Sequence, residues 1–540
     1  MNGKMIRAVL VGMTMPLILG SLVACSREKT TDSGTSGSPG ASSASSQTAP
    51  VTLKGMLFSE APKDLPVVLE EFEKQTKDQL NTKLSIEWNT IADHKQKVKL
   101  KMATGEAVDF IFDAPWMGIM YNMINQGAYA QLDSYFNNDQ YPGLKKAFSK
   151  ELLENNKING HIYSIPIVDI LKDVSVVVLR KDLREKYGLP AIKSYDDLKK
   201  FYDKVLENDK DLSPVSGMIG FSDFLETEFE NPNVFTMNLT TGDDWFVSLS
   251  PDGKKVEGLA IVGDPDSELA KFPAPYNTRA KLFENYYRYA EWSKYQPKDV
   301  LSQKMDNLWK AGKLASTGWL PVSLAPQSEA DLKKVLPNAE TEIFILSSCA
   351  RNFAKNCLQT DFRANNSIVI PANSKNIDRT MAFFDWLFSS RENHDLFQYG
   401  IAGKHWEPIG NDQYKELEQI DHYRFPGYEL TWNLNYFRMN TDAPDEVKKI
   451  WAYASKPESY KRKKLAGFIF NNEAVKLQLV QVQPKFEAFN EVAHAGLAGN
   501  GADFDAAAKK INEELRSLGL EQIRAELKRQ IQEYLDKNAK

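Results

Sequence analysis

Polar and aromatic side chains follow three segments that we expect to be strands. They are Ser59 and Glu60 after the first segment, Asn89 and Thr90 after the second, and Asp113 with Trp116 after the third. Their carboxylate, amide and hydroxyl groups form hydrogen bonds, and an indole ring offers a flat apolar face. This combination suits a ligand that carries both hydroxyl groups and apolar faces, as a sugar does.

The spacing of apolar residues predicts the elements that would position these side chains. Alternating apolar residues at 51–58 and 84–88, and a short apolar run at 109–112, predict strands. Helical spacing at 65–72 and 93–102 predicts one helix between each pair of strands. This order indicates a parallel sheet with helices on its faces, in which ligands bind beyond the carboxyl ends of the strands. We therefore expect these side chains at one edge of one sheet.

The remaining chain continues the α/β pattern. A run of β-branched residues at 174–180 predicts a strand that is buried on both faces or that crosses between lobes. Amphipathic helices are predicted at 195–210, 279–295, 376–390 and 503–536, the last interrupted at Gly519. Their apolar stripes are core-packing faces.

The first residues have the features of an export signal. Lys4 and Arg7 precede an apolar run at 8–20 that is too short to span a bilayer. This pattern predicts a secretory signal peptide at 1–24.

A lipid attachment site follows the signal. The tetrapeptide Leu-Val-Ala-Cys at 22–25 resembles the lipobox of bacterial lipoproteins, which implies a diacylglycerol on the Cys25 sulfur. The next residues are almost all small or polar, so 25–50 is predicted to be a lipidated, disordered tether. We expect the folded body to be held at the outer face of the cell membrane.

Charge and cysteine content narrow the class of protein. The net charge is −5, and loss of the two cations of the signal would make it −7, with no concentrated basic stripe. Nucleic acid is therefore excluded as an expected partner. Cys349 and Cys357 form either a local disulfide or two free buried thiols, and nothing nearby has metal-ligand spacing.

Signatures of enzymes are absent from the sequence. It contains no Gly-x-Ser-x-Gly, no phosphate loop, no His-Glu-x-x-His and no paired cysteine motif. We therefore predict no catalytic residue and no cofactor. A glycoside hydrolase needs only two carboxylates about 5 to 9 Å apart, so Asp113 with Asp169 remains an alternative enzymatic pair. A peptide-binding receptor is a third hypothesis.

Several segments, taken in order, resemble the LipO-like members of the extracellular solute-binding protein family 1. They are QGAYAQLD at 126–133, GHIYSIP at 160–166, LRKDL at 179–183, SYDDL at 194–198, AGKLA at 311–315, FDWLFSSRE at 384–392, YGIAGKH at 399–405 and INEELRSLGL at 511–520. Gly127 and Gly160 lie where the chain turns, and Pro166 fits an edge strand.

The resemblance implies a two-lobe, periplasmic-binding-protein-like α/β fold of type II, with a hinge and extra C-terminal helices. The expected lobes are 51–168 with 366–410, and 169–365 with 411–540. Crossings between them are expected near 168–176 and 346–366, and the chain from Asn366 to about Gly403 should pack on the first lobe.

The resemblance also assigns roles to individual residues. Asp113 and Trp116 lie in the loop that reaches the cleft in sugar-binding relatives, Asp169 lies where relatives place an acid that holds sugar hydroxyls, and Trp319 lies where they carry a stacking aromatic ring. Further candidates are Glu60, at a strand end, and Trp245, Trp406 and Trp432, from loop context. For each of them the alternative is a core or turn residue.

Some relatives carry a calcium loop after the helix that begins at Ser194. The corresponding stretch here, 207–214, lacks alternating oxygen ligands, the central Gly and the closing Glu, so we predict no metal ion there. Together with the lipobox, the resemblance implies a monomeric lipoprotein receptor of an ABC importer, which binds a carbohydrate between its lobes and delivers it to membrane permease subunits.

Overall fold

The structure, a computed structural model, describes residues 49–169, 174–215, 231–239, 244–297, 300 and 305–538. A five-stranded sheet, with strand order β2-β1-β3-β12-β4, organises the N-terminal part. Its strands are β1 (Val51–Phe58), β2 (Thr82–Asn89), β3 (Phe110–Asp113), β4 (Ser164–Ile167) and β12 (Asn366–Val369).

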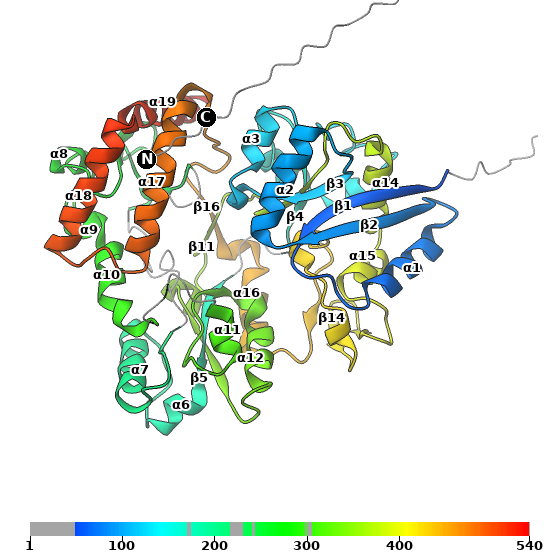
Figure 1. Ribbon diagram of the computed structural model, residues 1–540, viewed down its shortest axis with the longest axis horizontal. Coiled ribbons are helices and arrows are strands. Elements are labelled where there is room, and N and C mark those ends of the chain that lie inside the picture. Colours follow the sequence, from blue (N-terminus) through cyan, green and yellow to red (C-terminus); the bar gives the residue numbers. More distant parts are fainter. Residues whose placement is uncertain are drawn as a thin grey trace, which may run out of the picture. The chain divides into compact units, whose positions relative to one another are not determined.

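The first three strands confirm the predicted parallel arrangement. β1 pairs in parallel with β2 and β3, while α1 (Leu65–Thr76) and α2 (Ile91–Thr104) connect them (Figure 1). β12 arrives from far along the chain and pairs antiparallel with both β3 and β4. Pro166 lies in β4, the edge strand, a position at which proline is tolerated in a sheet.

The core around this sheet, called here the first core, includes residues from two distant stretches of chain. It contains Phe110, Phe112 and Ile368 from the sheet and side chains of α14 (Ile377–Leu387) and α15 (Arg391–Gln398). The segment from Asn366 onward thus contributes β12, α14 and α15 to the first core. The remaining helices of this part are α3 (Met120–Asn125), α4 (Pro142–Ala147) and α5 (Lys150–Asn155).

The first core extends further along the chain than the sequence indicated. Tyr423, Phe425, Leu430 and Tyr436 all belong to it, although we assigned 411–540 to the second lobe. The aromatic side chains of this stretch have no helical or strand period, so the sequence carried no signal for where they pack. β13 (Trp406–Ile409) and β14 (Gln413–Glu416) precede this stretch and form a small sheet with β15 (Met439–Asn440), which follows it.

A second sheet separates two further cores. It has the order β10-β5-β9, formed by β5 (Ser175–Arg180), β9 (Leu320–Pro321) and β10 (Thr341–Ile345). All six residues of β5 are buried. Val177 and Leu179 lie in a second core, whereas Val176 and Val178 lie in a third. The 174–180 run is therefore a strand buried on both faces.

The second core packs a three-stranded sheet against helices. Its elements are β6 (Val234–Met237), β7 (Trp245–Leu249), β8 (Val256–Ala260), α6 (Lys181–Lys186), α7 (Tyr195–Asn208), α8 (Asp266–Leu269), α9 (Arg279–Leu282), α10 (Glu284–Trp292), α17 (Lys476–His494), α18 (Ala502–Ser517) and α19 (Leu520–Asn538). The four predicted amphipathic helices are present, although the 279–295 segment divides into shorter helices. Gly519, at φ 106°, separates α18 from α19.

The third core contains α11 (Met305–Lys310), α12 (Ala325–Lys333) and α16 (Asp445–Ala454).

The segment 346–366 runs from the second core at Leu346 to the first core at Ala364, as expected of a crossing. It contains α13 (Ser348–Arg351) and β11 (Leu358–Thr360), which pairs in parallel with β16 (Tyr460–Arg462). Cys349 and Cys357 form a disulfide in this crossing, with Cα atoms 5.8 Å apart. The other expected crossing includes 170–173, outside the described residues.

A buried carboxylate ties the C-terminal helices to the second core. Asp264 is fully buried and accepts hydrogen bonds from Arg516 at 2.8 Å, from Arg524 at 2.8 and 2.9 Å, and from Asn512 at 3.0 Å. The preceding residue, Gly263, has φ 81°, and a Cβ there would overlap the Ala508 carbonyl. The loop after β8 thus fits closely against α18.

We predict that Gly263→Ala destabilises the protein by about 2 kcal/mol or more, because left-handed backbone strain and a clash with main chain add together. Gly188→Ala is the matched control: Gly188 has φ 68° and no heavy atom within 4 Å of a Cβ, so only the strain of about 1 kcal/mol applies. Urea unfolding of both variants measures the difference. Equal losses of stability would contradict the close packing at Gly263.

Candidate functional site

Four aromatic rings form a connected surface at the carboxyl edge of the first sheet. Phe58 ends β1, Trp116 lies in the turn after β3, and Tyr428 and Trp432 come from the loop after Pro426. Ring centroids lie 6.1 Å apart for Trp116 and Phe58, 5.7 Å for Phe58 and Tyr428, and 5.9 Å for Tyr428 and Trp432. We call these four residues the aromatic platform.

The platform combines exposure with polar groups. Trp116 is 39% exposed and its Nε1–H donates to the Asn366 Oδ1 at 3.0 Å, while the other three rings are half-buried. Glu60 is exposed and directly follows Ser59 at the end of β1. The structure thus places Trp116 and Trp432 on one surface, with Glu60 close by along the chain.

A buried carboxyl group lies behind the platform. Glu429 is 0% exposed; its Oε2 accepts the Phe58 N–H at 2.7 Å and its Oε1 accepts the Ser59 hydroxyl at 2.7 Å. The Ser59 and Tyr428 hydroxyl oxygens are also 2.7 Å apart. Burial raises the pKa of Glu429 to about 8, against the opposing effect of the hydrogen bonds from Ser59 and Phe58.

The sequence did not single out Phe58, Tyr428 or Glu429. The alternating pattern predicts Phe58 only as the last core residue of a strand. The stretch 423–437 has no apolar periodicity that would assign its aromatic residues to a surface. The one sequence feature that could have marked this stretch as a ligand-binding surface is its density of aromatic residues, six in fifteen positions.

Asp113 does not reach the surface, contrary to its predicted role in ligand binding. It is 0% exposed, and its carboxylate accepts the Ala114 N–H at 2.8 Å and the Tyr129 hydroxyl at 2.6 Å. Burial raises its pKa to about 7. The physical reason is that β3 is a central strand between β1 and β12, so its last residue is still inside. Asp113 instead braces the turn that carries Trp116.

Two of the candidate tryptophans are core residues. Trp245 is 2% exposed in the second core and packs under the Arg524 guanidinium, 5.6 Å from the ring. Trp406 is 5% exposed, and its Nε1–H donates to the Gly400 carbonyl at 2.9 Å. Of the ten tryptophans, all of which are described, only Trp116 and Trp319 are exposed.

Trp319 directly precedes β9 of the second sheet and is 48% exposed. Its backbone is fixed on both sides: the Thr317 N–H donates to the Val178 carbonyl at 2.8 Å, the Val178 N–H donates to the Thr317 hydroxyl at 2.9 Å, and Leu320 begins β9. A rigid support therefore presents a large apolar ring to solvent.

Asp169 is half-buried and lies where the first sheet leads to the second. The preceding residue, Val168, donates its N–H to the Trp432 carbonyl at 3.0 Å. Seven positions later Ser175 pairs with Pro321, two residues from Trp319. A chain of seven residues spans at most about 25 Å, so Val168, bonded to Trp432, and Ser175, paired with Pro321, lie within that distance of each other.

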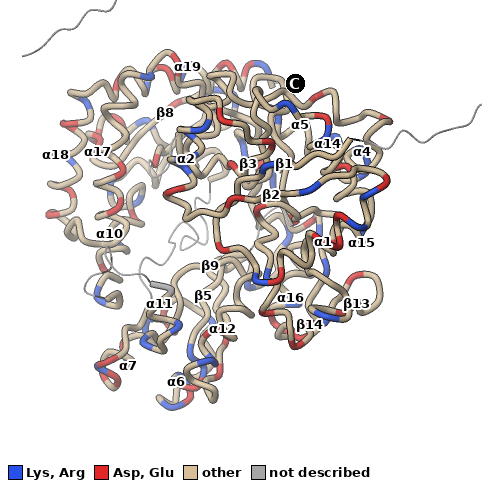
Figure 2. The backbone as a smooth tube through the Cα atoms, turned by 45° about the vertical axis from the view of Figure 1, so that its right-hand side comes forward, with Lys and Arg blue, Asp and Glu red and all other residues tan. Residues whose placement is uncertain are grey.

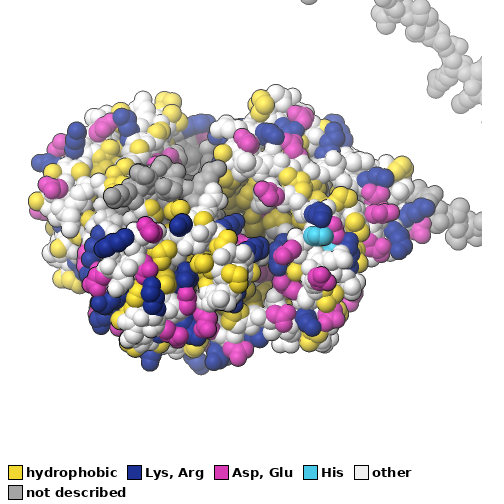
Figure 3. Space-filling model, turned by 60° about the horizontal axis from the view of Figure 1, so that its bottom comes forward, with side chains coloured by type: hydrophobic (Ala, Val, Ile, Leu, Met, Phe, Trp, Pro, Cys, Tyr) yellow, Lys and Arg dark blue, Asp and Glu magenta, His cyan; other side chains and the backbone are white. Residues whose placement is uncertain are grey.

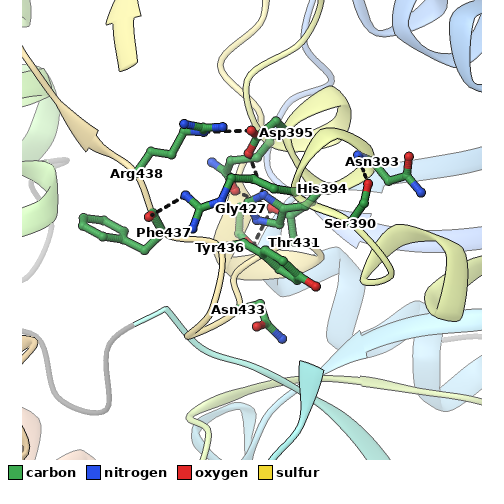
Figure 4. Close-up of polar contacts among 12 residues, drawn as sticks. Ser390, Asn393, His394, Asp395, Gly427, Thr431, Asn433, Tyr436, Phe437 and Arg438 are labelled. Atoms are coloured by element: carbon green, nitrogen blue, oxygen red, sulfur yellow. Dashed lines mark hydrogen bonds and ion pairs between the residues drawn. The ribbon is translucent and has the colours of Figure 1, made fainter. Parts of the chain in front are cut away.

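A polar network anchors the loop that carries Tyr428 and Trp432 (Figure 4). Asp395 on α15 accepts from the Arg438 Nε–H at 2.8 Å and contacts the His394 Nδ1 at 2.9 Å. The Tyr436 hydroxyl donates to the Phe388 carbonyl at 2.6 Å. Burial lowers the pKa of His394, so its imidazole is neutral and the buried ion pair is that of Arg438 with Asp395. The loop is therefore held at its far end by α15.

Charged side chains of both signs are interspersed over the surface. Figure 2 shows cationic and anionic positions along most of the helices, and the face in Figure 3 shows them intermixed with apolar side chains. Within the described part of the chain, no three His, Cys, Asp or Glu side chains are grouped so as to hold a metal ion. In the stretch 207–214, Asp209 accepts from the Lys186 ammonium at 3.0 Å and from the Tyr187 hydroxyl.

No helix in the described ranges has the length and apolar character needed to cross a bilayer.

Comparisons with known proteins agree with this architecture. A curated relative, a carbohydrate ABC transporter substrate-binding protein of Streptococcus pneumoniae serotype 4, is 24% identical over 496 residues, which cover 90% of this chain and 91% of the relative. The N-glycan transport solute-binding protein NgtS of Streptococcus pneumoniae, solved with Man1GlcNAc, matches with a TM-score of 0.68 at 19% identity, over 90% of this chain and 100% of that one.

A further solved structure is the substrate-binding protein FusA of S. pneumoniae with kestose, which has a TM-score of 0.59 at 18% identity, over 90% of this chain and 99% of that one. These likenesses show the two-lobe α/β fold of type II. A profile of a domain of unknown function matches 464–536, the C-terminal helices. The profile described as bacterial extracellular solute-binding protein matches 59–393, more than half of the chain, and the chain therefore belongs to that family.

Proposed function

We propose that this solute-binding protein is the carbohydrate receptor of an ABC importer. The observation that carries the proposal is the aromatic platform, four rings at the end of β1, in the turn after β3 and on one anchored loop, bordered by hydroxyl, amide and carboxyl groups. Sugars present flat C–H faces and a rim of hydroxyl groups, and such a surface complements both. The names of the relatives, which refer to a carbohydrate transporter, an N-glycan and kestose, support the same ligand class.

The ligand contacts both sheets. Trp116 and Trp319 are the two exposed tryptophans, one in the turn after β3 of the first sheet and one directly before β9 of the second. In this arrangement Asp169, half-buried two positions beyond β4, would accept hydrogen bonds from sugar hydroxyls. A saccharide that bridges the two rings binds the closed arrangement of the lobes more tightly than the open one, and so shifts the population toward it.

Export and anchoring complete the proposal. The signal peptide at 1–24 and the lipidated Cys25 lie outside the described residues, and their support is the sequence pattern alone. A monomer tethered by 25–50 at the outer membrane face carries its ligand to permease subunits in the same membrane. Mass spectrometry of the membrane fraction tests the anchor: a diacylglyceryl-modified N-terminal Cys25 peptide supports it, and an unmodified one contradicts it.

An enzymatic role has less support. Asp113, half of the carboxylate pair that a glycoside hydrolase would use, is buried and bonded to Tyr129 and Ala114. A general acid must contact the glycosidic oxygen. Recovery of intact oligosaccharide after long incubation with the protein supports the receptor, whereas products formed in catalytic amounts support the hydrolase.

We predict that Trp116→Ala and Trp319→Ala each weaken saccharide binding by about 1 kcal/mol or more, because each removes a stacking face. Isothermal titration with saccharides found by a thermal-shift screen, beginning with Man1GlcNAc and kestose, measures the loss. The control is Leu477→Ala, which truncates a side chain 78% exposed on α17. If either tryptophan variant binds as tightly as the Leu477 control, that ring is not part of the site.

Saturating saccharide should also make the protein more compact, because the closed lobes share the ligand. Small-angle scattering with and without ligand measures the radius of gyration. An unchanged radius, with binding demonstrated in the same sample, would contradict lobe closure.

A further inference from the structure

The carboxyl group of Glu429, the hydroxyl group of Ser59 and the hydroxyl group of Tyr428 form a continuous chain. Successive oxygen atoms are 2.7 Å apart at both steps, and the second carboxyl oxygen accepts the Phe58 N–H at 2.7 Å. Ser59 is held at φ 78°, a conformation that a non-glycine residue adopts only where its surroundings impose it. The chain begins at a fully buried group and ends at a ring of the aromatic platform.

The surroundings of Glu429 favour its neutral form. Burial is the main influence on its pKa, and the groups that oppose it are neutral: the Ser59 and Tyr428 hydroxyls and the Phe58 N–H. The titratable groups on neighbouring elements are Asp113 on β3, with a pKa raised to about 7, and His94 on α2, with a pKa lowered by burial. Glu60 lies beyond Ser59 and is exposed.

We propose that Glu429 is a positioning residue whose proton sets the direction of a hydrogen-bond relay through Ser59, so that Tyr428 presents a donor to the bound saccharide. The ligand atom that faces Tyr428 is then an acceptor: a ring oxygen, a glycosidic oxygen or an acyl carbonyl. This inference rests on the proposed carbohydrate site for its ligand, but the relay itself exists without ligand.

The direction of the relay follows from counting protons. With Glu429 neutral, its O–H donates to Ser59 Oγ, the Ser59 O–H donates to the Tyr428 oxygen, and the Tyr428 O–H is free for the ligand. With Glu429 ionised, the Ser59 O–H donates to the carboxylate and the Tyr428 O–H donates to Ser59 or directly to the carboxylate, so Tyr428 offers the ligand only lone pairs. Burial raises the pKa of Tyr428 itself to about 12, so its own ionisation does not interfere below pH 9.

Glu429→Gln is a mimic of the neutral acid, because its carbonyl accepts the Phe58 N–H and its amide donates to Ser59. A ligand-free experiment therefore tests the relay. A carboxyl group with a raised pKa stabilises the fold at low pH, and this contribution is lost as pH rises from the unfolded-state pKa of about 4.3 to about 8. The unfolding constant of the wild type should rise relative to that of Glu429→Gln, by up to tenfold per pH unit in this window, and level off above it.

Urea unfolding of wild type, Glu429→Gln and Glu70→Gln at pH 5 to 9 measures this ratio. Asp113 titrates in all three proteins and cancels from the comparison. Glu70→Gln alters an exposed carboxylate on α1 and should track the wild type at every pH. A constant ratio between wild type and Glu429→Gln over the whole range would overturn the relay, whether or not any saccharide binds.

Titration with Man1GlcNAc and with kestose tests the effect on the ligand. At pH 6, Glu429→Gln should bind within twofold of the wild type, and Tyr428→Phe five- to tenfold more weakly with an unchanged melting temperature. At pH 9 the wild type should fall to the level of Tyr428→Phe while Glu429→Gln keeps its affinity. Parallel pH profiles for wild type and Glu429→Gln would overturn the assigned role of Tyr428. Failure of both saccharides to bind any of the proteins would count against the proposed ligand class and leave the unfolding experiment to decide the relay.

Discussion

The candidate site depends on the attachment of one loop to the end of one strand. Glu429 binds the end of β1 through the Phe58 N–H and the Ser59 hydroxyl, while the Arg438–Asp395 pair fixes the far end of the same loop on α15. Burying a carboxyl group without a cation is costly unless it is neutral or well hydrogen-bonded, and both conditions hold here. The loop is therefore rigid where it carries Tyr428 and Trp432. A preformed aromatic surface loses little entropy when a ligand binds.

The second half of the site lies on a strand that is buried on both faces. Val176 to Leu179 fill two cores at once, so β5 cannot shift without disturbing both, and the bonds of Thr317 tie the Trp319 backbone to it. The disulfide-braced crossing 346–366 runs from the second core to the first core. Two rigid supports joined by a few crossing segments are the arrangement in which hinge closure moves whole surfaces together.

Local sequence patterns predicted those elements that are defined by their own periodicity. β1, β2, β3 and the helices between them follow from apolar spacing, and the break at Gly519 follows from its freedom at positive φ. β12 could not be recognised in this way, because its place between β3 and β4 depends on pairing with residues more than 190 positions away. Sequence patterns carry no such long-range information.

The candidate site residues likewise include some that are exposed and some that are buried, and local sequence patterns did not distinguish the two groups. Trp116 and Asp113 are three positions apart, yet one is exposed and the other buried, because the strand ends inside the sheet and the turn leaves it. Trp245 and Trp406 differ from Trp319 only in which residues pack on them, and the neighbouring residues in the sequence do not encode this difference.

The most direct test of the proposed site is a crystal structure of the protein with a bound oligosaccharide. The account predicts that one saccharide chain contacts the rings of both Trp116 and Trp319; a saccharide bound at one ring while the other remains in solvent would contradict it.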